Sequence, residues 1–405
     1  MDKSTTNETN FRYFARVNNG DKTEFLHFKK KTDSYVITYK LVDMPAEIMS
    51  DEIFFETEEL CQKEFECIGV RKKNTYDKTS HYGYLRLQSE NHSFMINCDE
   101  FAITAPPENL LFAETKHYTH DCDGEMKDDE ASIKKIANGI LNDPALPMLK
   151  HIRIGVFATM WEDTLDKWYT ILANYFITNK EKLQHIESLY IGDVGQCISE
   201  ISWLHNGNYG ELLKSLPNLK SFTMKGMPGK LAPEGEIFTH PSLETLEIIS
   251  GGLFKHIPET LKNSQLPKLQ KLILYIGVDN YGLDFEIDKL AELAKSNLFP
   301  NLIYLGFVNS EEQDKIAKII LESDILHQLE FLDLSFGTLT DKGGEILLEN
   351  AYKLLHLKQV KIEHHFLSDE MVEKLKLSQI KVCISDGQEA DNYGDEIYYY
   401  PMITE

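Results

Sequence analysis

The sequence has 405 residues, of which 42% are hydrophobic, which is enough for a buried core spread over two or three domains. Its 65 Asp and Glu residues outweigh 42 Lys and Arg, and the formal net charge of −23 disfavours nucleic acid and membranes as partners. The sequence has no long apolar run and no signal-peptide core, and its six cysteines are scattered, so we expect a cytoplasmic protein.

Residues 1–118 are expected to form an α+β domain. Strand composition marks residues 11–17, 24–28 and 34–41, and the turn Asn18-Asn19-Gly20-Asp21 predicts a hairpin between the first two. A helix is predicted over residues 57–67, and further strands over residues 82–88 and 93–97.

This order of elements resembles the WGR domain, a small sheet with one helix. The resemblance rests on Phe25 after the turn, on Phe54-Phe55 ahead of the predicted helix, and on a closing Gly83-Tyr84. Tyr39-Lys40-Leu41 stands where the family has Trp-Gly-Arg. Some members of that family contact DNA, so the resemblance implies a nucleic-acid-associated protein as the alternative function, against which the missing triad and the acidic charge argue.

Residues 119–132 are polar and acidic, and we place the domain junction there. His117, His120 and Cys122 are of zinc-ligand type and lie within six residues. Since no second pair of ligands follows at the usual spacing, a polar linker is the competing interpretation and no metal site is assigned. A helix is expected over residues 131–141.

Residues 133–388 contain eight or nine copies of the pattern Leu-x-x-Leu-x-Leu. The two last apolar positions of each copy alternate with period two and predict one side of a short strand. Proline precedes several copies and marks the change from helix to strand. The copies are Leu149/Ile152/Ile154, Ile186/Leu189/Ile191, Leu219/Phe222/Met224, Leu243/Leu246/Ile248, Leu269/Leu272/Leu274, Leu302/Leu305/Phe307, Leu329/Leu332/Leu334, Leu357/Val360/Ile362 and, more weakly, Leu377/Ile380/Val382.

Helices are predicted between the strands, over residues 164–178, 285–295, 313–321 and 345–355. Thr340 or Asp341 is expected to cap the last of these, and residues 366–371 repeat the same helix start. These two consecutive copies resemble the ribonuclease-inhibitor type of leucine-rich repeat. The resemblance implies an α/β solenoid with parallel strands on its concave side and helices on its convex side. Bacterial proteins with a WGR-like module, such repeats and a tyrosine-containing tail, here residues 389–405, look similar.

The positions between the core leucines are expected to face outward on the concave side. In register they form rows whose middle is apolar, and apolar patches of this kind mark interaction surfaces. Binding of a partner protein, covering by the N-terminal domain or by the tail with Tyr398, Tyr399 and Tyr400, and harmless exposure remain open. The candidate partner-binding residues are Ile249, Ile273, Tyr275, Tyr304, Val308 and Phe331.

Catalytic chemistry has no candidate residues in this sequence. It contains no Cys-x-x-Cys, His-Glu-x-x-His, Gly-x-x-x-x-Gly-Lys or Gly-x-Ser-x-Gly motif. His364-His365 follow an expected strand directly, and adjacent side chains of an extended chain point in opposite directions, so they do not easily form a joint site. We expect no cofactor and no enzymatic activity, and predict a protein-interaction scaffold that binds an unknown protein partner on the concave face.

Overall fold

The computed structural model describes residues 11–17, 22–31, 34–43, 46–55, 83–89, 92–96, 115–118, 130–143, 146–155, 165–192, 200–394 and 396–404. The chain divides into two units, one of Met1–Gly124 with Val194–Glu200 and one of Glu125–Asp193 with Ile201–Glu405. Residues 119–129 of the linker expected from the sequence lie outside the described residues.

The first unit contains an antiparallel sheet with the strand order β4-β3-β2-β1-β5-β6. The predicted strands are confirmed, and β4 is an addition that the sequence did not predict. The turn at residues 18–21 and the helix expected over residues 57–67 lie outside the described residues. The strands of this sheet are β1 (Phe11–Val17), β2 (Lys22–Lys31), β3 (Ser34–Asp43), β4 (Ala46–Phe55), β5 (Gly83–Ser89) and β6 (His92–Ile96). The strand β7 (Thr115–Tyr118) is not part of this six-stranded sheet.

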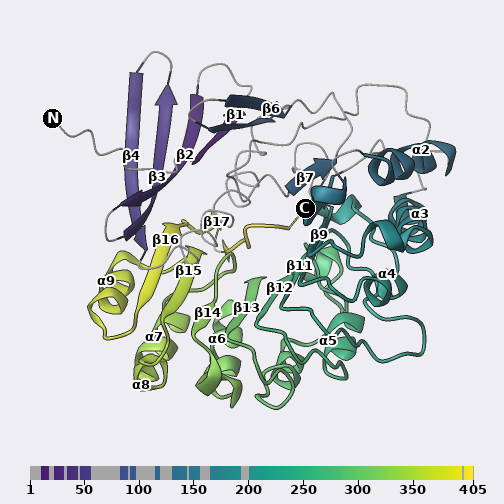
Figure 1. Ribbon diagram of the computed structural model, residues 1–405. Coiled ribbons are helices and arrows are strands. Elements are labelled where there is room, and N and C mark those ends of the chain that lie inside the picture. Colours follow the sequence, from purple (N-terminus) through teal and green to yellow (C-terminus); the bar gives the residue numbers. More distant parts are fainter. Residues whose placement is uncertain are drawn as a thin grey trace. The chain divides into compact units, whose positions relative to one another are not determined.

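The second unit is built on a parallel sheet in which the strands β8 to β16 pair in chain order (Figure 1). Each copy of the Leu-x-x-Leu-x-Leu pattern corresponds to one strand, because its alternating apolar side chains are buried on one side of the sheet. The strands are β8 (His151–Ile154), β9 (Ser188–Ile191), β10 (Ser221–Lys225), β11 (Thr245–Ile249), β12 (Lys271–Gly277), β13 (Tyr304–Ser310), β14 (Phe331–Asp333), β15 (Gln359–His365) and β16 (Val382–Gly387).

Helices connect many of these strands and lie on one side of the sheet (Figure 1). Short 3₁₀ turns alternate with them, including η2 (Leu146–Met148), η3 (Lys180–Lys182), η4 (Ile201–Trp203), η5 (Asp279–Tyr281) and η7 (Ile325–Gln328). The α-helices of the described residues are α2 (Glu130–Leu141), α3 (Leu165–Thr178), α4 (Gly210–Ser215), α5 (His256–Leu261), α6 (Gln313–Leu321), α7 (Asp341–Glu349), α8 (Ala351–Leu354) and α9 (Asp369–Leu377). None of these helices is long and apolar enough to cross a membrane.

The prediction of an α-helix over residues 285–295 is wrong, because the chain forms the 3₁₀ helix η6 (Ile287–Glu292) there. The buried residues Ile287 and Leu290 of this helix and the C-cap Leu293 are spaced by three. Three residues make one turn of a 3₁₀ helix, so this spacing aligns all three side chains toward the core. The α-helical interpretation failed because a run this short fits both periods.

The register predicted for the last copy of the Leu-x-x-Leu-x-Leu pattern is also wrong. Leu377 is 84% exposed at the end of α9, whereas Val382 pairs with Val360 and Ile384 with Ile362. Val382 therefore occupies the second apolar position of its strand and not the third. The other copies are confirmed, since the apolar residues of their strands are buried.

The two predicted helix starts are confirmed and are linked to each other. Thr340 caps α7, where its hydroxyl accepts a bond from Lys342 N, and Ser368 caps α9 by accepting from Met371 N. Each cap also donates to the aspartate of the preceding helix: Thr340 Oγ1 to Asp314 at 2.7 Å, and Ser368 Oγ to Asp341 at 2.7 Å. Consecutive helix starts are thus held at a fixed spacing by side-chain bonds.

Candidate functional site

The side of the sheet opposite the helices carries residues 399–404, which we call the C-terminal segment, and we call this side the tail-bearing face. The rows expected from the sequence are present on it. Thr245 pairs with Lys271, Lys271 with Tyr304, and Tyr304 with Phe331. One residue pair further along the strands, Glu247 aligns with Ile273 and Gly306 with Asp333. The outward positions are therefore in register across the sheet.

The six candidate partner-binding residues lie together on this face, in two states of burial. Ile249 and Val308 are fully buried, and Ile273 and Tyr275 are each 5% exposed. Tyr304 and Phe331 are half-buried. The buried four form one apolar cluster with Tyr190, Ile201, Phe336 and Ile403, against which Tyr304 and Met402 pack.

The C-terminal segment covers this cluster. Ile403 is 8% exposed and Pro401 is buried, whereas Tyr398, Tyr399 and Tyr400 are exposed. Covering by the tail was one of the alternatives left open by the sequence, but the tyrosines expected to do it are not the anchoring residues. Figure 1 shows the end of the chain crossing the strands of the second unit.

Hydrogen bonds hold the main chain of the C-terminal segment. The amide of Asn309 donates to Ile403 O at 2.6 Å and accepts from Ile403 N at 2.8 Å. Met402 N donates to Phe336 O at 2.8 Å, and the imidazole of His364 contacts Tyr400 O at 3.0 Å. At the far end, a Cβ on Gly251 would lie 2.6 Å from Thr404 O, so the glycine leaves room for the segment.

Three of the residues that bond to the segment share an unusual backbone conformation with one further residue, Asp386. Asn309, Phe336, His364 and Asp386 have φ values of +60°, +69°, +54° and +58°. In the register of strands β13 to β16, these four residues occupy corresponding places at the carboxyl ends of the strands. They form one row across the sheet, which we call the carboxyl-end row. Positive φ is costly for a bulky side chain such as Phe and tends to persist at binding sites.

The last two members of the row interact with each other. His364 Nδ1 lies 3.7 Å from Asp386 Oδ2, and the imidazole beside this carboxylate lowers the pKa of Asp386. The neighbouring His365 is only 3% exposed, and burial lowers its pKa. Its Nδ1 accepts a bond from Leu367 N at 3.1 Å, which requires that nitrogen to be unprotonated.

The opposite end of the tail-bearing face remains accessible and aromatic. The rings of Tyr304 and Phe331 stack with centroids 5.8 Å apart. Lys271 lies 4.7 Å from the Tyr304 ring centroid, and Tyr304 Oη donates to the buried Asp333 at 2.5 Å. This arrangement offers a flat aromatic surface with positive charge beside it.

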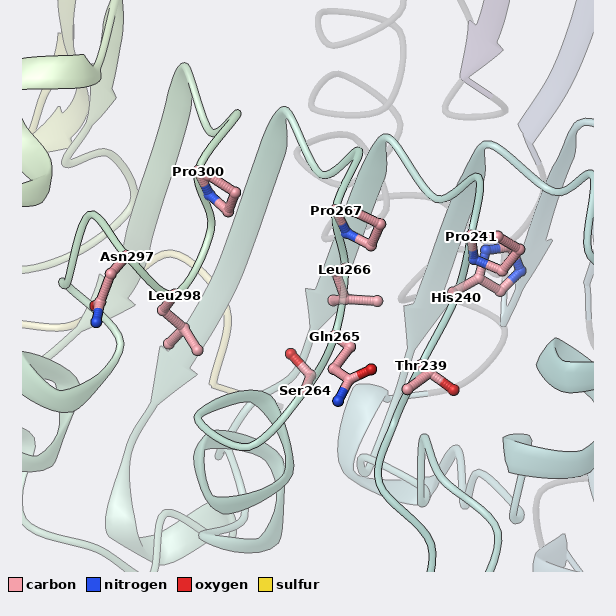
Figure 2. A pocket seen from close by; sticks show the side chains of 10 residues that line it. All are labelled: Thr239, His240, Pro241, Ser264, Gln265, Leu266, Pro267, Asn297, Leu298 and Pro300. Carbon is pink, nitrogen blue, oxygen red and sulfur yellow. The ribbon is translucent and has the colours of Figure 1, made fainter.

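A separate groove of about 590 Å³ runs along the strand starts (Figure 2). Pro241, Pro267 and Pro300 occupy corresponding places in consecutive repeats, as the sequence predicted for the change into each strand. His240 in its lining is 1% exposed and bonds to Leu216 O, and burial lowers its pKa. The lining has no Asp, Glu, Lys or Arg, so this groove offers little for acid–base chemistry.

Metal-binding groups are not assembled in the described part of the chain, where no cluster of three His, Cys, Asp or Glu side chains could hold an ion. His120 and Cys122 of the zinc candidate lie outside the described residues, as does the side chain of His117. The sequence did not single out Asn309, Phe336 or Ile403, because nothing in their local pattern marks contacts with a distant segment.

Comparison with solved structures finds a relative of known structure. No family model matches the chain, and no curated protein matches it. A crystal structure of a Bacteroides fragilis protein, determined by the Northeast Structural Genomics Consortium, is similar with a TM-score of 0.61 and 30% sequence identity. The match covers 94% of this chain and 97% of that one. The chain therefore belongs to the family of this Bacteroides fragilis protein.

Proposed function

We propose that the second unit is a leucine-rich-repeat solenoid of the ribonuclease-inhibitor type. Support comes from strands that pair in chain order, from core positions that repeat in each strand, and from consecutive helix caps at Thr340 and Ser368. Stacked repeats of this kind share one continuous core and expose one long sheet surface to partners. We also propose that residues 1–118 form a WGR-like domain, since the strands that carry the resemblance, including Gly83-Tyr84, are in the expected places.

We propose that the protein is a non-enzymatic interaction scaffold and that the tail-bearing face binds a partner protein. One observation carries this proposal: the face already binds a polypeptide segment, the C-terminal segment, through hydrogen bonds to its main chain and through an apolar cluster. Beside that segment, the half-buried Tyr304 and Phe331 present aromatic area, which is enriched at protein interfaces.

The test compares two single substitutions that remove one aromatic ring each. Phe331→Ser acts on the tail-bearing face, and Tyr352→Ser acts on a residue that is 70% exposed on α8. Phe331 is preferred over Tyr275 because Tyr275 is buried and stacks on Phe336. Because Tyr275 is buried, replacing it with a charged residue would destabilise the fold and would not report on binding.

Affinity capture from the native cells, quantified against the wild-type chain, gives the readout. We expect a specific partner that the wild type and Tyr352→Ser retain and that Phe331→Ser loses by at least about tenfold, the effect of one hot-spot residue. A partner that Phe331→Ser retains at the wild-type level contradicts the proposal, provided that both variants melt like the wild type.

A further inference from the structure

We infer that the carboxyl-end row is a peptide-binding site, and that the C-terminal segment is a displaceable ligand bound in cis. The site takes in trans an uncharged, extended segment of a partner with the chemistry of residues 400–404: an aromatic residue, proline and two apolar residues. This inference rests on the proposed function, because it assigns a second part of the tail-bearing face to a partner.

The recognition is mainly of the peptide backbone. The amide of Asn309 is fully buried and satisfies both the N–H and the C=O of Ile403. Phe336 O accepts a hydrogen bond from Met402 N, and the imidazole of His364 contacts Tyr400 O. Bonds of this kind are available to any extended chain and provide affinity, while side-chain pockets provide specificity, as in β-strand addition.

Specificity comes mainly from the side chain of Ile403. Ile403 enters the cluster of Tyr275, Val308 and Phe336, and the ring of Phe336 stacks on Tyr275 at 5.8 Å. A charged residue in place of Ile403 would be buried in an apolar cluster, which is strongly unfavourable. The segment itself carries no charge from Tyr399 to Thr404.

The connection to the rest of the chain favours displacement. The strands β17 (Asp391–Tyr393) and β18 (Glu396–Tyr398) pair only with each other in the described sheets. Ile397, Tyr399 and Tyr400 are 58%, 40% and 49% exposed. The segment can therefore leave the row without breaking the parallel strand pairing of β8 to β16. A tethered ligand of this kind competes with an effective concentration in about the millimolar range.

The test uses the full-length chain with Ile403→Asp, which frees the row, and a fluorescent peptide of residues 398–405. We expect saturable binding by fluorescence anisotropy, at least about tenfold tighter than to the wild type, where the tethered segment competes. Adding Asn309→Gly should weaken binding at least about tenfold, since glycine tolerates the positive φ and removes only the amide. The control peptide carries the Ile403→Asp change and should not bind.

Three results would overturn the inference. The first is a folded Ile403→Asp chain without saturable binding up to about 1 mM peptide, a concentration that corresponds to negligible affinity. The second is equal binding with and without Asn309→Gly. The third is a wild-type chain that is dimeric in light scattering and becomes monomeric with Ile403→Asp, which would assign the row to a second copy.

If Ile403→Asp does not fold, Ile403→Gly replaces it, because it removes the side chain without burying a charge. The result is separable from the proposed function. Phe331 is outside the carboxyl-end row, so a failed peptide experiment leaves the Phe331→Ser outcome intact. Likewise, a partner that Phe331→Ser retains leaves the peptide experiment intact.

Discussion

At the scale of single residues, Asn309 connects an unfavourable backbone conformation with a binding role. Its φ of +60° is better tolerated by Asn than by most residues, and its buried amide makes two bonds to Ile403. We expect Asn309→Gly to leave the main unfolding transition nearly unchanged, because glycine accepts this φ. The C-terminal segment should lose about 2 kcal/mol of docking free energy, which is the worth of two hydrogen bonds.

Amide hydrogen exchange of Ile403 and Met402 measures that loss, with Leu305 in β13 as an internal reference for the sheet. The expected result is faster exchange at the segment with unchanged exchange at Leu305. Equal protection of the segment in the variant and the wild type would show that the amide of Asn309 does not hold it.

A second prediction at this scale concerns pH. Burial lowers the pKa of His365 below its unfolded value, so the unfolded chain binds more protons between the two values. The stability that neutral His365 contributes is therefore present above its unfolded pKa of about 6.5 and lost as the pH falls through the folded pKa. We expect the urea midpoint to decrease from about pH 7.5 to about pH 5.5.

His365→Asn should reduce that decrease, because an Asn oxygen can accept the bond from Leu367 N and does not titrate. His327 is exposed and serves as the matched control. His327→Asn is expected to keep the wild-type pH dependence. The assignment to His365 is refuted when both variants show the same slope.

At the scale of elements, helix starts are tied together from one repeat to the next. Ser368 both caps α9 and donates to Asp341, the first residue of α7. Ser368→Ala removes both bonds and should cost about 1–2 kcal/mol of unfolding free energy. Ser368→Thr, which keeps the hydroxyl, should cost less than half as much in the same denaturant titration; equal losses for the two variants would rule out this role of the hydroxyl.

The C-terminal segment gives another prediction at this scale. If it is a displaceable ligand, its amides exchange through local opening and not through global unfolding. In the wild type we expect Met402 and Ile403 to exchange at least about a hundredfold faster than Leu305 and Leu332, since a few hydrogen bonds hold the segment. Identical exchange free energies for all four would mean that the segment is a permanent part of the core.

At the scale of the whole molecule, the repeated part of the fold could be predicted because its signal is periodic. The strands β8 to β15 and the outward rows follow from leucine positions that recur in each copy. The errors occurred where the pattern is short or shifted, as at η6 and at β16. Residues of the first unit that could test the WGR-like resemblance further lie outside the described residues.

The docking of the C-terminal segment could not be predicted in the same way. Asn309 and Ile403 are 94 residues apart, and no repeat or motif relates them. Ile249, Tyr275 and Val308 indicated an apolar patch on the face, but binding of a partner, covering by the chain itself and harmless exposure were all compatible with it. The positive φ values that align the carboxyl-end row belong to the backbone and are visible only in the structure.

The central claim is that the tail-bearing face binds an extended polypeptide. Its most direct test is the hydrogen-exchange footprint of the peptide of residues 398–405 on the full-length Ile403→Asp chain. We predict protection that is confined to the carboxyl ends of β11 to β15, around Gly251, Tyr275, Asn309, Phe336 and His364. Protection elsewhere in the chain, or none at a saturating peptide concentration, would contradict the account.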